Sequence, residues 1–486
     1  MADTEIKTKN GGGSELSEYP FLKTDNKKIN DAYRLAVANL AANILPFKDG
    51  VLECEKPVII AGLGYETPWT RDAAINTWNA GALICPEVAL NTLKSVLKKD
   101  DNGYSVDGEY WDRIIWAIGA WQYYICTGNT DFLSIAYEAV CNSLEYFEKT
   151  EFSEELNLFR GAACYGDGVA AYPDIYAKHG ESGIIVFASK CRELCDDTGV
   201  GIPIYALSTN CLYYMAYVLA DKMAAELKKP LKYSDKAEKI KRAINKVFWN
   251  GKTGNYNYIY DKFGGCDYQE GLGISFAVLF GIADDEQKKS IFDNYKTTPY
   301  GIPCVFPSFE RYNTLDGLGF GRHSGTVWPH VQGFWADAVA ENGRRELFDK
   351  EFMLQTQNAL RYYQFAEIYH PLTGEIYGGR QERGNGIVEW RAEPYQTWSA
   401  TAYLRNVYMN LIGMNFSPAG IKFMPIGSHL VNSMALINLK YKKSVLNITV
   451  NGSGNSISSF TVNGKERTPF IGSDEEGELN IVIILK

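Results

Sequence analysis

The stretch YWDRIIWAIGAWQYYICTGNTDFLSIAYEAVCNSLEYFEK, residues 110–149, decides the fold because it encodes two helices in succession. Apolar residues recur with helical spacing through 111–127 and again through 130–149. Gly128 and Asn129 stand between the two runs, where a helix end and a new helix start are expected. Two helices joined by so short a turn form an antiparallel αα-hairpin.

The same pattern extends over residues 27–413. Helical spacing and stop signals predict twelve helices: 27–45, 71–82, 86–98, 111–127, 130–149, 208–227, 233–248, 270–281, 284–295, 325–341, 345–364 and 395–412. Six αα-hairpins closed in a ring would make an (α/α)6 barrel. A helical solenoid would also show pairs, but the chain has no fixed repeat length.

Short connections alternate with long ones along this region. The long ones are residues 50–70, 99–110, 150–207, 249–269, 296–324 and 365–394. Loops longer than ~12–15 residues are usually functional. In a barrel all six would gather at one end, so we expect the functional site there.

From about residue 418 the pattern changes. INLKYKKSVLNITVNG and SISSFTVNGKERTPFIG alternate apolar and polar residues, and both contain Asn-Gly, a hairpin turn signal. The predicted organisation is a flexible tail over 1–26, an (α/α)6 barrel over 27–415 and a small β-sandwich-like domain over 416–486.

Composition excludes several classes of function. The chain of 486 residues has net charge −9 and no Lys/Arg-rich block, so nucleic-acid binding is not expected. No apolar run reaches the ~18 residues of a membrane span. The N-terminus lacks the apolar segment of a signal peptide, so we expect either a cytoplasmic protein or one whose leader has been removed. The ten cysteines are scattered without a zinc-binding pattern, and no metal site is predicted.

Acids among aromatic residues mark the candidate site. Glu367 lies in FAEIYHPLTGEIYGG, residues 365–379, between a segment with Trp328 and His330 and a helix with Trp398. Aromatic rings stack on the apolar faces of sugars, while an acid transfers a proton or activates a water. Glu389 and Glu393 are alternatives to Glu367 for the same role.

Two further segments carry candidate residues. YETPWTRDAAINTW, residues 65–78, places Trp69, Arg71 and Asp72 at the mouth of a long loop. LFRGAACYGDGVAAYP, residues 158–173, sets Asp167 between two glycines and close to Tyr165, inside the longest loop. The remaining candidates for substrate binding stand at the start of the helix 111–127; they are Trp111 and Asp112.

These motifs, in this order, resemble those of the inverting (α/α)6 glycosidases, in particular glycoside hydrolase family 63 and the glucosidase half of glycogen-debranching enzymes. The resemblance spans residues 65–412. Its closest matches are SGTVWP at 324–329, E-x-Y-x-P-x-T-G at 367–374 and TWSATAYL at 397–404. YGDGVAAYP is similar to the acid-bearing loop G-x-D-D-x-P-R, although the second Asp and the Arg are missing here.

The resemblance implies hydrolysis of a terminal glycosidic bond with inversion, with Asp167 as acid and Glu367 as base. Asp72 is the alternative candidate for the acid. Inversion requires two carboxyl groups ~6.5–9.5 Å apart, and the reaction needs no metal or organic cofactor. The expected activity is that of an α-glucosidase on short oligosaccharides. A disaccharide phosphorylase on the same barrel and a non-catalytic carbohydrate-binding protein remain alternatives.

Overall fold

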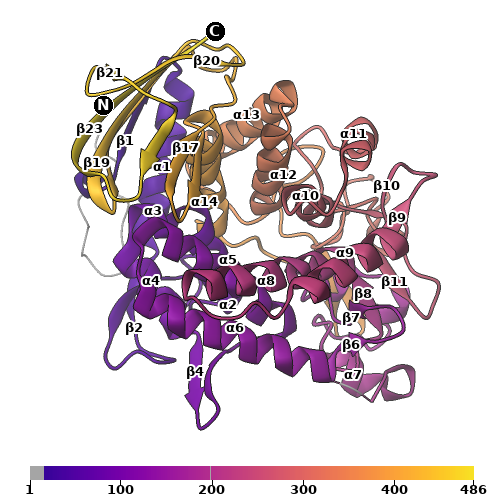
Figure 1. Cartoon of the computed structure of the whole chain (residues 1–486). Helices are drawn as coiled ribbons and strands as arrows, with labels where there is room; N and C mark the ends of the chain where they lie inside the picture. The colour runs from indigo at the N-terminus through magenta and orange to yellow at the C-terminus, as the bar shows by residue number, and fades with distance from the viewer. Residues whose placement is uncertain (1–15, 198) are drawn as a thin grey trace.

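A computed structural model describes residues 16–197 and 199–486, and most of the chain before residue 412 is helical (Figure 1). Six helices form its interior. They are α2 (Thr70–Asn76), α5 (Tyr110–Thr127), α8 (Leu207–Glu226), α10 (Gly271–Leu279), α12 (Pro329–Glu341) and α14 (Thr397–Arg405). Each of them contacts the next in this order, and α14 contacts α2.

Outer helices alternate with these along the chain. They are α1 (Lys27–Ala42), α4 (Pro86–Ser95), α6 (Thr130–Thr150), α9 (Ser234–Phe248), α11 (Asp285–Asn294) and α13 (Arg345–Tyr362). α4 packs on α5, α6 on α5 and α8, α9 on α8, and α13 on α12. α1 packs on α14, so the first and last helices of the region form a pair.

The twelve predicted helices are present, and their ends are displaced by up to about four residues when the π-helical turns that continue α2 and α14 are counted. Two inner helices differ in detail from the prediction. α2 and α14 each continue into a π-helical turn, Thr77–Gly81 and Asn406–Leu411. Two short helices were not predicted, α3 (Ala82–Ile84) and α7 (Val186–Lys190).

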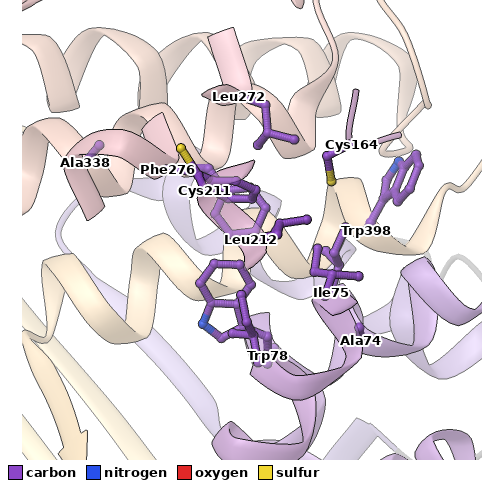
Figure 2. Close-up of a cluster of buried hydrophobic side chains, with 14 of the residues drawn as sticks. Ala74, Ile75, Trp78, Cys164, Cys211, Leu212, Leu272, Phe276, Ala338 and Trp398 are labelled. Carbon is purple, nitrogen blue, oxygen red and sulfur yellow. The ribbon is translucent and has the colours of Figure 1, made fainter. Parts of the chain in front are cut away.

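Apolar side chains of the inner helices meet in the centre of the helical region. Ile75 lies on α2 and Trp78 on the π-helical turn that continues it. Figure 2 shows both side chains facing Leu212, Leu272 and Phe276. The Trp78 ring stacks on Phe334 with 4.6 Å between centroids. Because an inner helix such as α10 is buried on all sides, it has no polar face.

A long segment precedes each inner helix and carries short strands, which pair as hairpins within a segment or with a strand of the next segment. Their strands are β2 (Ile44–Phe47) with β3 (Lys56–Ile59), β4 (Leu97–Asp100) with β5 (Gly103–Val106), β6 (Phe152–Ser153) with β7 (Leu158–Phe159), β8 (Ile204–Ala206) with β11 (Ile259–Asp261), β9 (Trp249–Asn250) with β10 (Asn255–Tyr256), β12 (Gln269–Glu270) with β13 (Val305–Phe306), and β14 (Arg380–Arg383) with β15 (Gly386–Glu389). These segments end at the N-termini of the inner helices.

Two sheets complete the structure, and all of their strands except β1 follow the helices. One has the strand order β1-β18-β19-β23-β20-β21, and the other has β16-β17-β22. The strands are β1 (Phe21–Thr24), β16 (Met414–Ser417), β17 (Gly420–Phe423), β18 (Ser433–Tyr441), β19 (Lys443–Asn451), β20 (Ile457–Val462), β21 (Lys465–Glu466), β22 (Phe470–Gly472) and β23 (Glu476–Leu485). The Phe423 and Phe460 rings, one from each sheet, lie 5.4 Å apart.

The N-terminal segment corrects one prediction. Residues 1–26 were expected to be a flexible tail, and residues 1–15 lie outside the described part. Within the rest, β1 pairs with β18, and a short 3-10 helix, Leu16–Glu18, precedes it. The alternating burial of Phe21–Thr24 explains the difference, because Leu22 and Thr24 turn inward.

Within the described residues, no helix combines the length and the apolar character that crossing a membrane would require.

Candidate active site

A cavity of about 290 Å³ opens where the long segments meet the N-termini of the inner helices. Eight of the eleven predicted site residues line it: Trp69, Arg71, Asp72, Tyr165, Asp167, Trp328, Glu367 and Trp398. They come from separate parts of the chain that the fold brings together. The cavity volume lies at the lower end of the range for small-molecule sites.

Glu367 accepts three hydrogen bonds from two donor groups. Arg322 Nη2 lies 2.9 Å from one carboxylate oxygen and 2.8 Å from the other. The backbone N–H of Glu393 donates to Oε2 at 2.9 Å. Arg322 is itself fixed because its Nη1 donates to the carbonyl of Gly378 at 2.9 Å. These bonds fix the orientation of the Glu367 carboxylate.

The two alternative glutamates lie outside the cavity wall. Glu389 is exposed at the end of β15. The carboxylate of Glu393 accepts a hydrogen bond from the N–H of Gly64. The structure therefore brings Glu367, rather than either alternative, to the cavity.

Asp167 lies between two basic side chains. Arg71 Nη1 is 3.1 Å from Oδ2, and His323 Nε2 is 3.4 Å from Oδ1. Burial raises the pKa of Asp167, but Arg71 and His323 outweigh it and hold that pKa well below its usual range. The Asp167 side chain is 45% exposed, so it faces the open part of the cavity.

Asp72 has the opposite electrostatic environment. It lies in the first turn of α2 and is only 3% exposed. Burial raises its pKa to about 8; Arg71 lowers it, whereas the carboxylates of Asp112 and Glu367 raise it further. Gln396 Nε2 donates to Asp72 Oδ1 at 3.3 Å. Asp72 is therefore a carboxyl group that holds a proton near neutral pH.

Three predicted residues lie behind the cavity rather than in its wall. Asp112 Oδ1 is 3.3 Å from Arg71 Nε, and the Arg71 guanidinium lies 4.7 Å from the centre of the Trp111 ring. His330 is fully buried and stacks on Trp398 with 4.3 Å between ring centres. Burial lowers the pKa of His330 to about 3, so its ring is neutral. These three residues support Arg71 and Trp398.

Tyr165 connects the aromatic wall to the Asp167 loop. Its ring centre lies 5.2 Å from that of Trp328 and 4.9 Å from that of His330. Its backbone has φ 57°, which is uncommon for a bulky residue. The backbone N–H of Asp167 donates to the carbonyl of Tyr165 at 3.0 Å, so this turn sets the direction of Asp167.

The cavity also has wall residues that the motifs did not reveal: Tyr65, Glu109, Gly168, Ser182, Gly183, Arg322, His323, Gln381, Trp390 and Gln396. Arg322 and His323 directly precede SGTVWP, which was the available signal for them. Gln381 lies on β14 and Trp390 follows β15, so in sequence they read as parts of an ordinary hairpin.

Several polar atoms of this wall have no partner within the described protein. They are Gln381 Oε1, Gln396 Oε1, Trp390 Nε1 and Trp398 Nε1. Buried polar groups are normally hydrogen-bonded, so these atoms are among the exceptions in this part of the structure. Residues 16–197 and 199–486 contain no group of three or more His, Cys, Asp or Glu side chains suited to a metal ion.

Solved structures with a similar fold include a sialidase (TM-score 0.68, 14% identity, 96% of this chain) and the GH78 rhamnosidase of Bacillus sp. GL1 (TM-score 0.57, 14% identity, 96% of this chain). This chain spans 40% and 44% of their respective lengths. The GH63 mannosylglycerate hydrolase from Thermus thermophilus in complex with glucose aligns with TM-score 0.55 and 15% identity, over 76% of this chain and 98% of that one.

Comparison with curated protein sequences found no significant match. Residues 112–399 match the family described as "Mannosylglycerate hydrolase MGH1-like glycoside hydrolase domain". The match covers more than half of the chain, and it confirms the resemblance to family 63 glycosidases. It favours hydrolysis over the phosphorylase and the non-catalytic alternatives. The chain therefore belongs to the family of MGH1-like glycoside hydrolase domains.

Proposed function

We propose that this protein is an exo-acting, inverting α-glucosidase for short oligosaccharides, built on an (α/α)6 barrel. The observation that carries the proposal is the small cavity into which Glu367 and Asp167 project from separate segments between aromatic side chains. The successive contacts of the six inner helices, with α14 returning to α2, support the barrel.

In the proposed reaction Glu367 is the general base. A water molecule attacks the anomeric carbon and passes a proton to Glu367, while the bond from that carbon to the glycosidic oxygen breaks. Arg322 and the N–H of Glu393 hold the Glu367 carboxylate in one orientation, which suits a group that must align a water.

Asp167 is the proposed general acid because of its position. In an exo-acting enzyme the terminal sugar occupies the deep end of the cavity and the glycosidic oxygen lies nearer the opening. Asp72 is nearly fully buried, which places it beside the terminal sugar, whereas the Asp167 side chain is half-exposed. Because Arg71 lowers the pKa of Asp167, its protonation requires acidic pH or a substrate that weakens this ion pair.

Stereochemistry tests the proposal directly. Proton NMR of the first product, taken before mutarotation, should show the β-anomer from an α-linked disaccharide such as maltose or kojibiose. Initial release of the α-anomer would mean a covalent route with two carboxyl groups only ~5 Å apart, and it would overturn the assignment of Glu367 as base.

A second experiment separates the two acid candidates. Asp167→Asn should reduce turnover of a disaccharide far more than that of an aryl glycoside, because a good leaving group needs little protonation. Asp72→Asn, which alters the deep end of the cavity, should reduce both rates to a similar extent. If instead only Asp72→Asn spares the aryl glycoside, the acid is Asp72.

A further inference from the structure

The proposed acid, Asp167, meets a different basic group at each of its two oxygens. Arg71 Nη1 lies 3.1 Å from Oδ2, and His323 Nε2 lies 3.4 Å from Oδ1. A guanidinium group does not lose its proton in proteins, whereas an imidazole gains and loses one between about pH 5 and 8. Of these two neighbours, His323 is therefore the one that can give a proton to Asp167.

The ring of His323 is held in one orientation by aromatic packing. Its side chain is 4% exposed, and it stacks on Trp328 with 5.1 Å between ring centres and 23° between ring planes. Trp328 is itself fixed, because its Nε1 donates to the carbonyl of Arg322 at 2.8 Å. The Tyr165 ring lies 6.0 Å away on another side. This packing keeps Nε2 directed at Asp167.

The second ring nitrogen, Nδ1, has a polar neighbour that also lacks a partner. His323 Nδ1 and Gln381 Oε1 are both buried without a hydrogen-bond partner within the described protein. A Cβ at Gly168 would lie 2.8 Å from this nitrogen and 2.0 Å from this oxygen, so both atoms occupy the space beside Gly168. Because both atoms are shielded from the cavity, a ligand cannot satisfy them. A proton on Nδ1 would make each atom the partner of the other.

Other titratable groups close to the ring do not compete for this proton. Burial lowers the pKa of His330 to about 3, so that ring is neutral. Burial also holds the pKa of Tyr165 well above its usual range, so its hydroxyl keeps its proton. Glu382 on β14 is paired with Arg311, whose Nε lies 2.9 Å from its carboxylate.

The charges that act on the ring directly are those around Asp167. The Asp167 carboxylate favours a protonated ring at this distance, and the ring in turn helps to hold the pKa of Asp167 well below its usual range. Arg71 opposes the protonated ring from the far side of the carboxylate. The neighbouring Arg322 is neutralised by Glu367, since its Nη2 bonds both carboxylate oxygens.

We propose that His323 holds the proton that Asp167 delivers, so that the two side chains share one proton between Nε2 and Oδ1. This inference rests on the proposed function, in which Asp167 is the acid. His323 acts on the substrate through Asp167, which makes it a positioning residue.

The proton moves in two steps. When a substrate weakens the ion pair of Asp167 with Arg71, the Nε2–H bond of His323 breaks and an O–H bond forms at Oδ1. The proton then passes to the glycosidic oxygen, while the bond from that oxygen to the anomeric carbon breaks and leaves its electron pair on the oxygen. Solvent returns one proton to the pair after the product leaves.

The pH dependence of hydrolysis tests the inference. For a disaccharide, kcat/KM should fall on the alkaline side in the range where an imidazole loses its proton. His323→Asn keeps an N–H donor for Asp167 but cannot take up a proton, so this fall should move to lower pH by at least about one unit. His429→Asn, the same change at an exposed position, should leave the profile as in the wild type. A loss by one constant factor at every pH would show a purely structural role and overturn the inference.

Variants of Gln381 test the contact at Nδ1. Gln381→Glu places a charged acceptor beside the ring, so the alkaline fall should move to higher pH. Gln381→Met keeps the length of the side chain but removes the acceptor, so the fall should move to lower pH. An alkaline fall at the wild-type pH in both variants would contradict the inference.

Histidine NMR gives a readout that does not depend on activity. The chain has five histidines, and the signal of His323 is the one that is missing in His323→Asn. In the wild type this ring should carry protons on both nitrogens at pH 6, and in Asp167→Asn it should lose the second proton at a lower pH. A single proton on the wild-type ring at pH 6 would refute the shared proton. If the ring carries both protons and no glycoside is hydrolysed, the proposed function alone has failed.

Discussion

At the scale of single residues, the site shows what a sequence motif can reveal. The cavity positions of Glu367 and Asp167 could be predicted because aromatic residues and family-like motifs surround both acids in the sequence. The neighbouring SGTVWP motif marked the segment of Arg322 but not its role, because that role depends on the contacts of Arg322 with Glu367 and with the carbonyl of Gly378 in the folded chain. The pKa of Asp72 was equally hidden, since burial and neighbouring charges determine it.

Glu367→Gln should lower turnover by at least about a hundredfold, because a general base contributes ~10²–10⁴-fold. The protein should remain folded, since glutamine keeps the size of the side chain and one acceptor for Arg322. Steady-state kinetics on a disaccharide, together with circular dichroism, measures both. Glu389→Gln is the matched control, because Glu389 is exposed outside the cavity. Comparable losses in the two variants would contradict the role of Glu367.

At the scale of elements, helices were predictable because their signals are local. The break at Gly128-Asn129 appears in the structure as a left-handed Gly128 and an Asn129 cap that accepts from the N–H of Phe132. The π-helical turns of α2 and α14 were not predictable, because their apolar spacing reads like that of an ordinary helix. The strand at Phe21–Thr24 was missed because its partner, β18, lies far away in the sequence, at residues 433–441.

A buried acid at the junction of two inner helices gives a prediction on stability. Glu270 precedes α10, is 1% exposed, and accepts from the N–H of Ser208 in α8 at 3.0 Å. Burial raises its pKa from 4.5 to about 8, and the bond from Ser208 offsets only part of this increase. The folded state therefore binds more protons than the unfolded state between these pH values. Stability should fall as pH rises through this window, by up to ~1.4 kcal/mol per pH unit.

Glu270→Gln should reduce the fall in Tm between about pH 5 and pH 8.5, because glutamine does not titrate yet still accepts from Ser208. Thermal unfolding at the two pH values measures the effect. Glu286→Gln, an exposed substitution in the first turn of α11, should leave the pH dependence as in the wild type. An identical pH dependence in all three proteins would show that Glu270 is already ionised in the folded state.

At the scale of the whole molecule, the two ends of the described chain lie together. β1 pairs with β18 of the C-terminal sheet, and the following helix α1 packs on α14 (Figure 1). Tyr33 on α1 joins these parts, because its hydroxyl donates to the carbonyl of Pro20 at 2.7 Å and lies 2.8 Å from the hydroxyl of Tyr408. Residues near both ends therefore hold the first and last helices beside each other. This pair also supports the segment around Tyr395, whose carbonyl accepts from the Asn43 side chain at 2.8 Å.

Leu22→Ala tests this closure of the chain. Leu22 is 1% exposed and lies opposite Leu436, so truncation leaves a cavity between β1 and the C-terminal sheet. Such a change typically costs ~2–5 kcal/mol, and chemical denaturation should show a lower midpoint. Lys23→Ala, at the exposed neighbouring position, should change the midpoint little. If β1 contributed nothing to the fold, both variants would unfold like the wild type. Neither Leu22 nor Leu436 lines the cavity that contains Glu367. Leu22→Ala should therefore leave kcat/KM within about twofold of wild type at temperatures where the variant is folded. A loss of stability without a loss of activity would separate the closure of the chain from the chemistry of the site.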